Sequence, residues 1–219
     1  MKIKTLLFTS IGNLFITINL FSQVAPGINW QNTIGGSDSD YPYSICKTSD
    51  GGYIIGGNSN SNISPDKSEN CIGTMDYWIV KINEAGSIEW DKTIGGDGLE
   101  YLSKVYQTAD GGYIIGGSSY SNISGDKTEP NFSDNPSTED YWIVKTDSNG
   151  NVEWDKTLGG NSFDDLGDIK QTPDGGYLVG GHSMSDSSGN KTEGVLGLED
   201  YWIIKLNSIG DIEWQNTIQ

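Results

Sequence analysis

Three polar segments recur along the chain and bring serine, asparagine and acidic side chains close together. Each contains an Asp or Asn directly before a lysine, and a glutamate two positions after that lysine. Calcium binds about six to eight oxygen ligands, so oxygens from these segments could form calcium sites. The spacing does not fit the EF-hand loop, and the same residue types also cap backbone groups in long turns. The candidate calcium ligands are Asp66, Glu69, Asp126, Glu129, Asn190 and Glu193.

A second group of candidate residues lies beside these segments and in the connections between repeats. It combines one acidic residue from the same position of each repeat with three tyrosines. Exposed tyrosine rings pack on sugars and in protein interfaces. Carboxylate pairs could support glycoside chemistry, but among 30 acidic residues no pair stands out. We predict that the following residues bind a protein or glycan ligand: Tyr41, Tyr101, Tyr120, Asp40, Glu100 and Asp164.

Residue patterns typical of catalysis are weak in this sequence. The only histidine, His182, aligns with Asn58 and Ser118 of the other repeats, which predicts an exposed loop residue. A Ser-His-Asp arrangement would need this histidine, and the spacing supports none. Zinc sites need clusters of histidine and cysteine, which the chain lacks. The sequence therefore favours a binding or scaffold role. The alternatives are a polysaccharide-acting enzyme and a structural spacer in a larger surface protein.

A repeat of about 60 residues must position these side chains. Tryptophans recur at residues 30, 90, 154 and 214, and an Asp-Gly-Gly-Tyr sequence begins at residues 50, 110 and 174. Within a unit, apolar and polar residues alternate with a period of two, which predicts strands over 43–48, 53–57, 77–82 and 88–94. Asp before Gly-Gly is a strong hairpin signal. The sequence therefore predicts units of four antiparallel strands and no helix in the mature chain.

The connections between these strands differ in length at the two ends of each unit. The Asp-Gly-Gly turn and the turn containing Gly86 are short. At the opposite end, segments 58–75, 118–139 and 182–199 join the second strand to the third. Loops longer than about 12–15 residues are usually functional or disordered. We therefore expect one end of the molecule, the long-loop face, to carry the ligand-binding residues.

The repeated motifs resemble those of Kelch-type propeller blades. The double glycines at 56–57, 116–117 and 180–181 close a strand, and an acidic-aromatic strand, a turn and a tryptophan follow. The pattern DGGYIIGG…DYWIVK…IEW is also similar to repeats of secreted propeller-like proteins from Bacteroidetes-type bacteria. This resemblance covers roughly residues 28–218. It implies a β-propeller fold, but it implies no particular activity, because propellers carry many functions.

The number of repeats falls short of a closed propeller, which has about four to eight blades. The mature chain, 23–219, contains three repeats (approximately 30–89, 90–153 and 154–219) and four tryptophan-bearing outer strands. We expect an all-β, propeller-like array of three four-stranded antiparallel units, with a β-trefoil-like fold as the alternative. The shortfall is consistent with a fragment, an open arc, or an arc that self-associates or belongs to a larger repeat array.

Charge and the N-terminal sequence limit the partners and the location. The formal net charge is −17 and every basic residue is a lysine, so the chain would repel nucleic acid and anionic membranes. Residues 1–22 combine a basic start with an apolar run, which predicts a signal peptide. We therefore expect a protein of the cell envelope or exterior, periplasmic or extracellular, with no membrane insertion after cleavage. Cys46 and Cys71 could form a disulfide there.

Overall fold

The computed structural model describes residues 27–218, so the predicted signal peptide lies outside the described residues. These residues form twelve β-strands and no helix, and thus contain no helix that could cross a membrane. The strands are β1 (Asp40–Lys47), β2 (Tyr53–Ser59), β3 (Asp76–Ile82), β4 (Ile88–Ile94), β5 (Glu100–Gln107), β6 (Tyr113–Ser119), β7 (Asp140–Thr146), β8 (Val152–Leu158), β9 (Asp164–Gln171), β10 (Tyr177–Ser183), β11 (Asp200–Leu206) and β12 (Ile212–Ile218).

The strands form three separate four-stranded antiparallel sheets, in the orders β1-β2-β3-β4, β5-β6-β7-β8 and β9-β10-β11-β12. The predicted hairpin turns are present: Gly51 has a φ of 91°, and Thr48 and Gly52 donate hydrogen bonds to the Asp50 side chain. The expected strands are confirmed with shifted ends, because β1 begins at Asp40 and β2 continues to Ser59. The fold is therefore an all-β, propeller-like array of three units.

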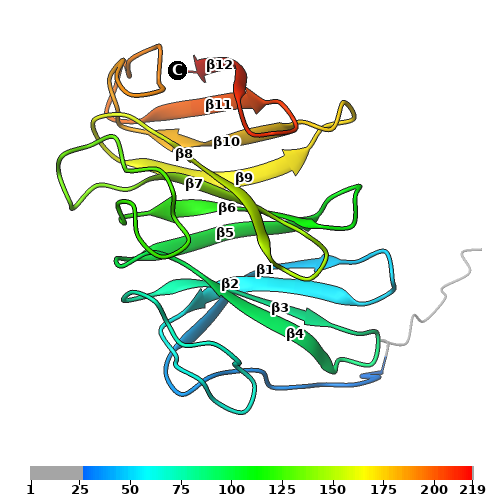
Figure 1. Ribbon diagram of the computed structural model, residues 1–219. Helices are drawn as coiled ribbons and strands as arrows, with labels where there is room; N and C mark the ends of the chain where they lie inside the picture. Colours follow the sequence, from blue (N-terminus) through cyan, green and yellow to red (C-terminus); the bar gives the residue numbers. More distant parts are fainter. Residues whose placement is uncertain (1–26, 219) are drawn as a thin grey trace, which may run out of the picture.

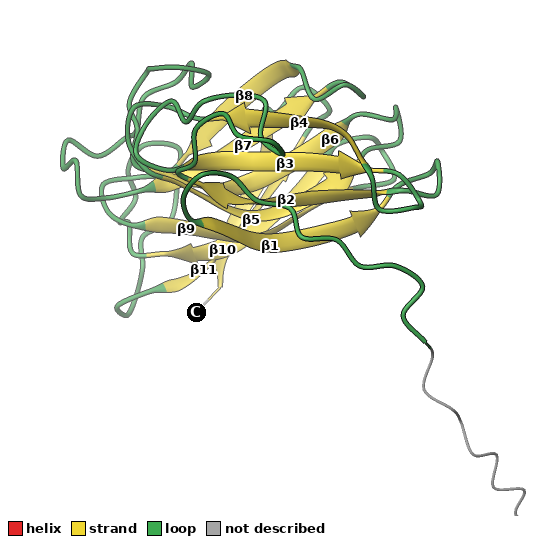
Figure 2. Ribbon diagram, turned by 90° about the horizontal axis from the view of Figure 1, so that it is seen from below, coloured by secondary structure: helices red, strands yellow, loops and turns green. Residues whose placement is uncertain are grey.

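The sheets are stacked in chain order, as Figure 1 shows. Strand β5 packs against β1 and β2, and β9 packs against β5 and β6. The first strand of each sheet thus lies next to the neighbouring sheets, and β4, β8 and β12 lie at the far edges. The long connections gather at one end of the strands and the short turns at the other (Figure 2). This arrangement creates the long-loop face expected from the sequence.

Apolar side chains fill the two spaces between successive sheets. The space between the first and second sheets holds Tyr77, whose ring stacks on Trp142 with centroids 5.0 Å apart. The space between the second and third sheets repeats this pair with Tyr141 and Trp202, 5.2 Å apart. The mid-strand tryptophans Trp142 and Trp202 therefore pack between sheets at the two interfaces.

The segment 28–34 differs from the expectation of a fourth tryptophan-bearing strand, because it is not part of any sheet. It nevertheless lies where the outer strand of a preceding sheet would lie. Trp30 covers Gly86 as Trp90 covers Gly150 and Trp154 covers Gly210. Asn32 also donates a 3.1 Å hydrogen bond to the Gly86 carbonyl. Pairing is absent because the described residues contain no third strand beside this segment.

Candidate functional site

A buried lysine organises each long connection on the long-loop face. Lys67, Lys127 and Lys191 are at most 2% exposed. Lys67 Nζ donates to the Glu69 carbonyl at 2.8 Å and to Thr93 Oγ1, and Lys127 makes the same two bonds with Glu129 and Thr157. Because the ammonium groups satisfy oxygens inside the loops, these long connections have a defined conformation next to the fourth strands.

The predicted calcium ligands all lie in these connections, but each has a protein partner. Asp66, Asp126 and Asn190 accept hydrogen bonds from backbone N–H groups of the double glycines that follow the outer segments, at 3.0–3.4 Å. The three glutamates accept from the threonines at 93, 157 and 217. Among residues 27–218, no three His, Cys, Asp or Glu side chains are grouped as metal ligands would be. Calcium binding stays a prediction, which melting in calcium and in EDTA would test.

Asp40, Glu100 and Asp164 occupy one repeated position and hold the connections between sheets. Glu100 accepts from Gly96 N at 2.9 Å and from Ser119 Oγ at 2.9 Å. Asp164 accepts from the corresponding glycine, Gly160, at 2.8 Å. Glu100 and Asp164 are fully buried, whereas Asp40 is half-buried. Only Asp40 of the three is therefore placed where a ligand could reach it.

Buried carboxyl groups face one another at the sheet interfaces. Burial raises the pKa of Glu100, and the neighbouring Asp76 carboxyl raises it further against the hydrogen bonds that Glu100 accepts. Burial also raises the pKa of Asp140 to about 7, to which the charge of Asp164 contributes. Asp140 Oδ1 and Asp164 Oδ1 are buried without a protein hydrogen bond. Each interface thus favours retention of a proton on its carboxyl pair.

Two of the three predicted ligand-binding tyrosines lie together. Tyr101 and Tyr120 make an edge-on contact with ring centroids 6.1 Å apart, and Tyr101 is 38% exposed. The Tyr120 hydroxyl interacts with the Glu139 carboxylate. Burial and then the charge of Asp165 raise the pKa of Glu139 to about 7. We call Tyr101, Tyr120, Glu139 and Asp165 the aromatic-acidic cluster. Tyr41 lies elsewhere, in a pocket of the first sheet.

His182 lies at the edge of this cluster and corrects the expectation of a loop residue, because it belongs to strand β10. Its Nε2 is 3.8 Å from Asp165 Oδ2, while Ser118 Oγ donates to Asp165 Oδ1 at 3.0 Å. Serine and histidine therefore meet the same carboxylate from two sides. A nucleophilic triad requires the serine to contact the histidine, so this geometry does not form one.

Sequence reasoning missed Glu139 and Asp165. Each lies next in sequence to a buried acidic residue: Asp140 follows Glu139, and Asp164 precedes Asp165. For Asp165 the alternation of strand side chains is a usable signal, since Asp164 and Asp165 are successive residues of β9 and point to opposite faces. Glu139 precedes β7, so this signal does not apply to it. Asp140 and Asp164 are buried at the sheet interfaces, and the residue beside each of them in the sequence belongs to the cluster.

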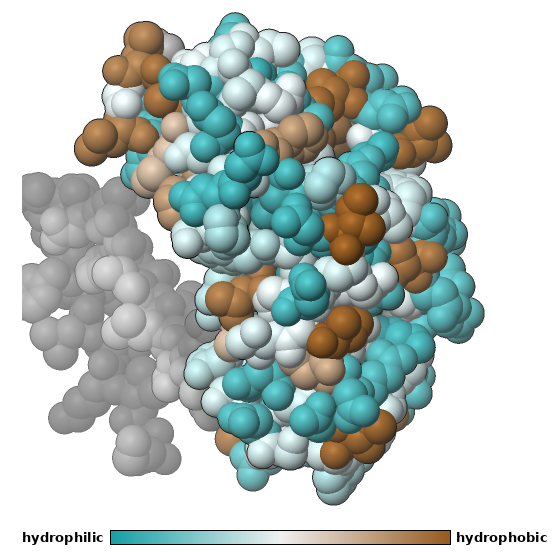
Figure 3. All heavy atoms as spheres, turned by 60° about the vertical axis from the view of Figure 1, so that its left-hand side comes forward, coloured by the Kyte–Doolittle hydropathy of each residue, from teal (hydrophilic) through white to brown (hydrophobic). Residues whose placement is uncertain are grey.

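The long-loop face is largely polar, with separate apolar patches among the hydrophilic atoms (Figure 3). Two exposed isoleucines at one repeated position, Ile63 and Ile123, belong to the loops. Small separate patches of this kind suit recognition of polar surfaces that contain scattered apolar groups, such as protein surfaces or sugars.

No protein-family model matches the chain, and no curated protein is significantly similar to it. The resemblance to Kelch-type blades therefore stays a prediction.

Proposed function

We propose that the chain is a secreted, non-catalytic binding or scaffold module that recognises protein or glycan through its long-loop face. The aromatic-acidic cluster is the observation that supports this proposal. It places a partly exposed tyrosine pair beside two acidic side chains on a rigid sheet framework. Tyrosine rings supply large contact area at low entropic cost, and carboxylates accept hydrogen bonds from hydroxyl or amino groups.

The substitution Tyr101→Ala tests this proposal. The variant removes the exposed ring without touching either interface core, so it should fold and lose ligand binding by about tenfold or more, as expected for an aromatic anchor. Tyr43→Ala is the matched control, because Tyr43 is also exposed but lies further along β1. Binding is measured against a glycan array and a panel of extracellular proteins. Equal binding by the two variants would contradict the role of the cluster.

A polysaccharide-acting enzyme is the second candidate, and one observation favours it. Burial and the Asp165 charge give Glu139 a pKa of about 7, which suits a general acid next to a second carboxylate. Hydrolysis of a polysaccharide panel that Glu139→Gln abolishes would support this function. A panel without turnover, combined with ligand binding, would leave the binding module as the function.

A further inference from the structure

The first and third sheets each present an apolar face on which no further sheet packs within residues 27–218. On the third sheet this tail face consists of Leu178, Tyr201, Ile203 and Ile218. On the first sheet the head face consists of Ile45, Ile55, Trp78 and Val80. Ile45 is exposed, whereas Trp78 and Val80 are buried in a cluster against which Ile34 of the N-terminal segment packs. The corresponding residues of the second sheet are buried against its two neighbours. The chain therefore carries the two halves of one more sheet-on-sheet interface.

The repeated positions show what the tail face lacks. Tyr77 and Tyr141 are fully buried against the next sheet, whereas Tyr201, at the same position, is 67% exposed. The hydroxyl groups of both buried tyrosines donate to backbone carbonyls of the next sheet, at 3.2 and 3.3 Å. Tyr201 has the same place on its sheet and faces no following sheet among the described residues.

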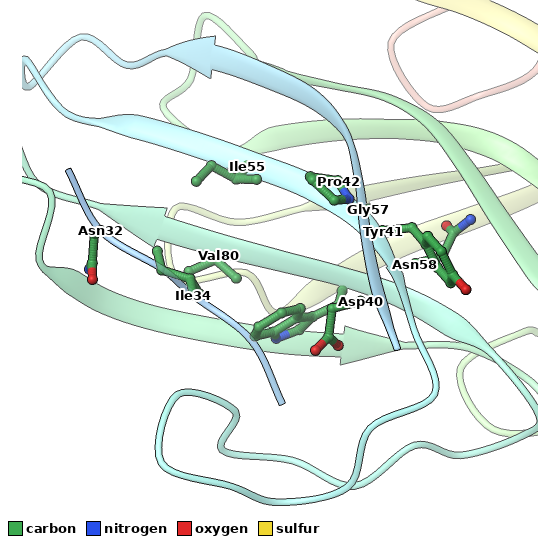
Figure 4. Close-up of a pocket in the computed structure, with 10 residues that line it drawn as sticks. Asn32, Ile34, Asp40, Tyr41, Pro42, Ile55, Gly57, Asn58 and Val80 are labelled. Carbon is green, nitrogen blue, oxygen red and sulfur yellow. The ribbon is translucent and has the colours of Figure 1, made fainter. Parts of the chain in front are cut away.

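The head face contains a matching socket. It is a pocket of about 180 Å³ whose lining residues include Trp78. Figure 4 shows Ile34, Ile55, Asn58 and Val80 among its lining residues. The second and third sheets hold a tyrosine of the preceding sheet at this position, stacked on Trp142 and Trp202 respectively. Trp78 is the tryptophan at this position in the first sheet. The socket thus has the shape and the wall that a tyrosine of a preceding sheet requires.

A second complementary contact joins each pair of sheets, in which an apolar residue of the following sheet packs on a glycine of the preceding sheet. Val105 packs on Gly56, and Ile169 packs on Gly116, where a Cβ atom would lie 2.8 Å from each. The residue at this position in the first sheet is Ile45, which is 65% exposed. The corresponding glycine of the third sheet, Gly180, lies in an open pocket of about 180 Å³ together with Leu178 and Ile203. Ile45 and Gly180 therefore complement each other.

We propose that two copies of this chain associate head to tail, with the tail face of one copy packed on the head face of the other. Tyr201 of one copy enters the socket beside Trp78 of the second copy, and Ile45 of the second copy seats on Gly180 of the first. Two such contacts join two three-sheet chains into one ring of six sheets, within the range of about four to eight for closed propellers.

The N-terminal segment controls this contact. Residues 28–34 (INWQNTI) and 212–218 (IEWQNTI) differ only at Asn29 and Glu213. Residues 28–34 occupy the outer-strand position in front of the first sheet, which is the position that β12 of a docking copy must take. Trp214 is 51% exposed and would cover Gly86 in place of Trp30. The segment therefore competes with association and must move away when a second copy docks.

Light scattering and sedimentation of the mature protein test the contact. A chain that begins at Gly35 lacks the competing segment and should self-associate about tenfold more tightly than the chain from residue 23, a difference of about 1.4 kcal/mol. Its mass should reach that of two copies. If both chains remain monomeric at high concentration, the proposal is wrong. Larger oligomers that depend on Tyr201 would support the contact and overturn closure at two copies.

Two acidic substitutions then test which faces meet. Tyr201→Asp and Ile45→Asp are each exposed in the monomer and should fold, but each should abolish self-association. A mixture of the two variants retains one intact tail and one intact head, so it should form a heterodimer with a single joint. Ile123→Asp, on a loop of the second sheet, is the matched control and should associate normally. Association that both variants retain, or a mixture that stays monomeric, would contradict head-to-tail packing.

Discussion

One lysine in each sheet joins three elements that are separate in sequence. Lys145 is 4% exposed; its ammonium lies 3.0 Å from Asp110 and 2.9 Å from Glu153, and it donates to the Thr146 carbonyl. Burial alone would raise the pKa of Asp110, but hydrogen bonds from Thr108 and Gly112 and the nearby ammonium lower it to about 2. The lysine thus ties the Asp-Gly-Gly turn to the third and fourth strands of its sheet.

Replacing this lysine by an apolar residue should destabilise the protein. In Lys145→Met, the Asp110 and Glu153 carboxylates lose their shared cation and repel each other. Because both carboxylates are about half exposed, the cost should be about 1–3 kcal/mol rather than that of a fully buried pair. Urea unfolding measures it. Lys170→Met removes a lysine that is 66% exposed and should change the unfolding free energy by less than about 0.5 kcal/mol.

The buried carboxyl pairs should make stability depend on pH in the opposite direction from ordinary acid denaturation. The raised pKa values of Glu139 and Asp140 mean that the folded state binds more protons than the unfolded state between about pH 4 and 7. Their contribution to the free energy of unfolding is therefore fully present below about pH 4 and is lost as the pH rises through 7. We expect Tm to increase when the pH is lowered from 8 to 5.

The substitution Asp140→Asn should flatten this pH profile, because it removes one titrating carboxyl from the interface. Asp211→Asn is the control, since Asp211 is 58% exposed and belongs to a short turn. Below about pH 4, stability should fall again. The pKa values of Asp110 and Asp174 are lowered to about 2, so the stability from their lysine partners declines below their unfolded pKa of about 4 and is lost as the pH falls through 2. A Tm that rises steadily from pH 5 to 8 would contradict the assignment of the raised pKa values.

Within the strands, the first residue of each double glycine determines how closely the neighbouring sheet can approach. At Gly116 an added methyl group would lie 2.8 Å from Ile169 and 3.0 Å from Leu166, so the facing side chains would have to move. At Gly180 the nearest atom is the end of Ile203, at 3.0 Å. Gly116 therefore packs against the neighbouring sheet, whereas Gly180, at the same position of the third sheet, faces no other sheet among the described residues.

Alanine at these two positions should have different effects on the monomer. Gly116→Ala should lower the unfolding free energy by about 1–3 kcal/mol through overpacking. Gly180→Ala should change it little, but should weaken self-association. Chemical denaturation at low protein concentration separates the two effects from association. Equal destabilisation by both variants would indicate that backbone conformation, rather than the facing sheet, requires glycine there.

The strands and hairpins could be predicted from the sequence because their signals are local. The alternation from Ile88 to Ile94 and the turn at Asp50-Gly51 depend only on neighbouring residues. The place of residues 28–34 could not be predicted in this way, since their sequence matches an outer strand and only the missing third strand prevents pairing. The cluster of Tyr101 with Glu139 was also out of reach, because a long connection brings them together across two strands.

The whole molecule carries a net charge of −17, and cleavage of the predicted signal peptide, residues 1–22, would make it −19 because Lys2 and Lys4 would be lost. The two sheet interfaces within the chain already bring acidic side chains together, since the charge of Asp164 raises the pKa of Asp140. By the same repeat positions, a head-to-tail contact would bring Asp200 of one copy near Asp40 of the other. Repulsion between like charges therefore opposes association of complete copies at low ionic strength.

Salt should consequently strengthen the dimer. The screening length falls from about 10 Å at 0.1 M to about 3 Å at 1 M salt. We expect sedimentation to show tighter association in 1 M than in 0.1 M sodium chloride, and Asp200→Asn to reduce this difference. Asp211→Asn serves again as the control. Association that weakens with added salt would indicate that ion pairs, rather than apolar packing, stabilise the head-to-tail contact.

The order of the sheets along the chain also has a consequence for folding during synthesis. Each sheet is complete within its own stretch of sequence, so an emerging chain can fold sheet by sheet from its N-terminal end. Residues 28–34 reach the solvent before the first sheet and can cover Gly86 as soon as that sheet forms. The growing chain therefore shields the head face from the start, whereas the tail face forms only when β11 and β12 have emerged.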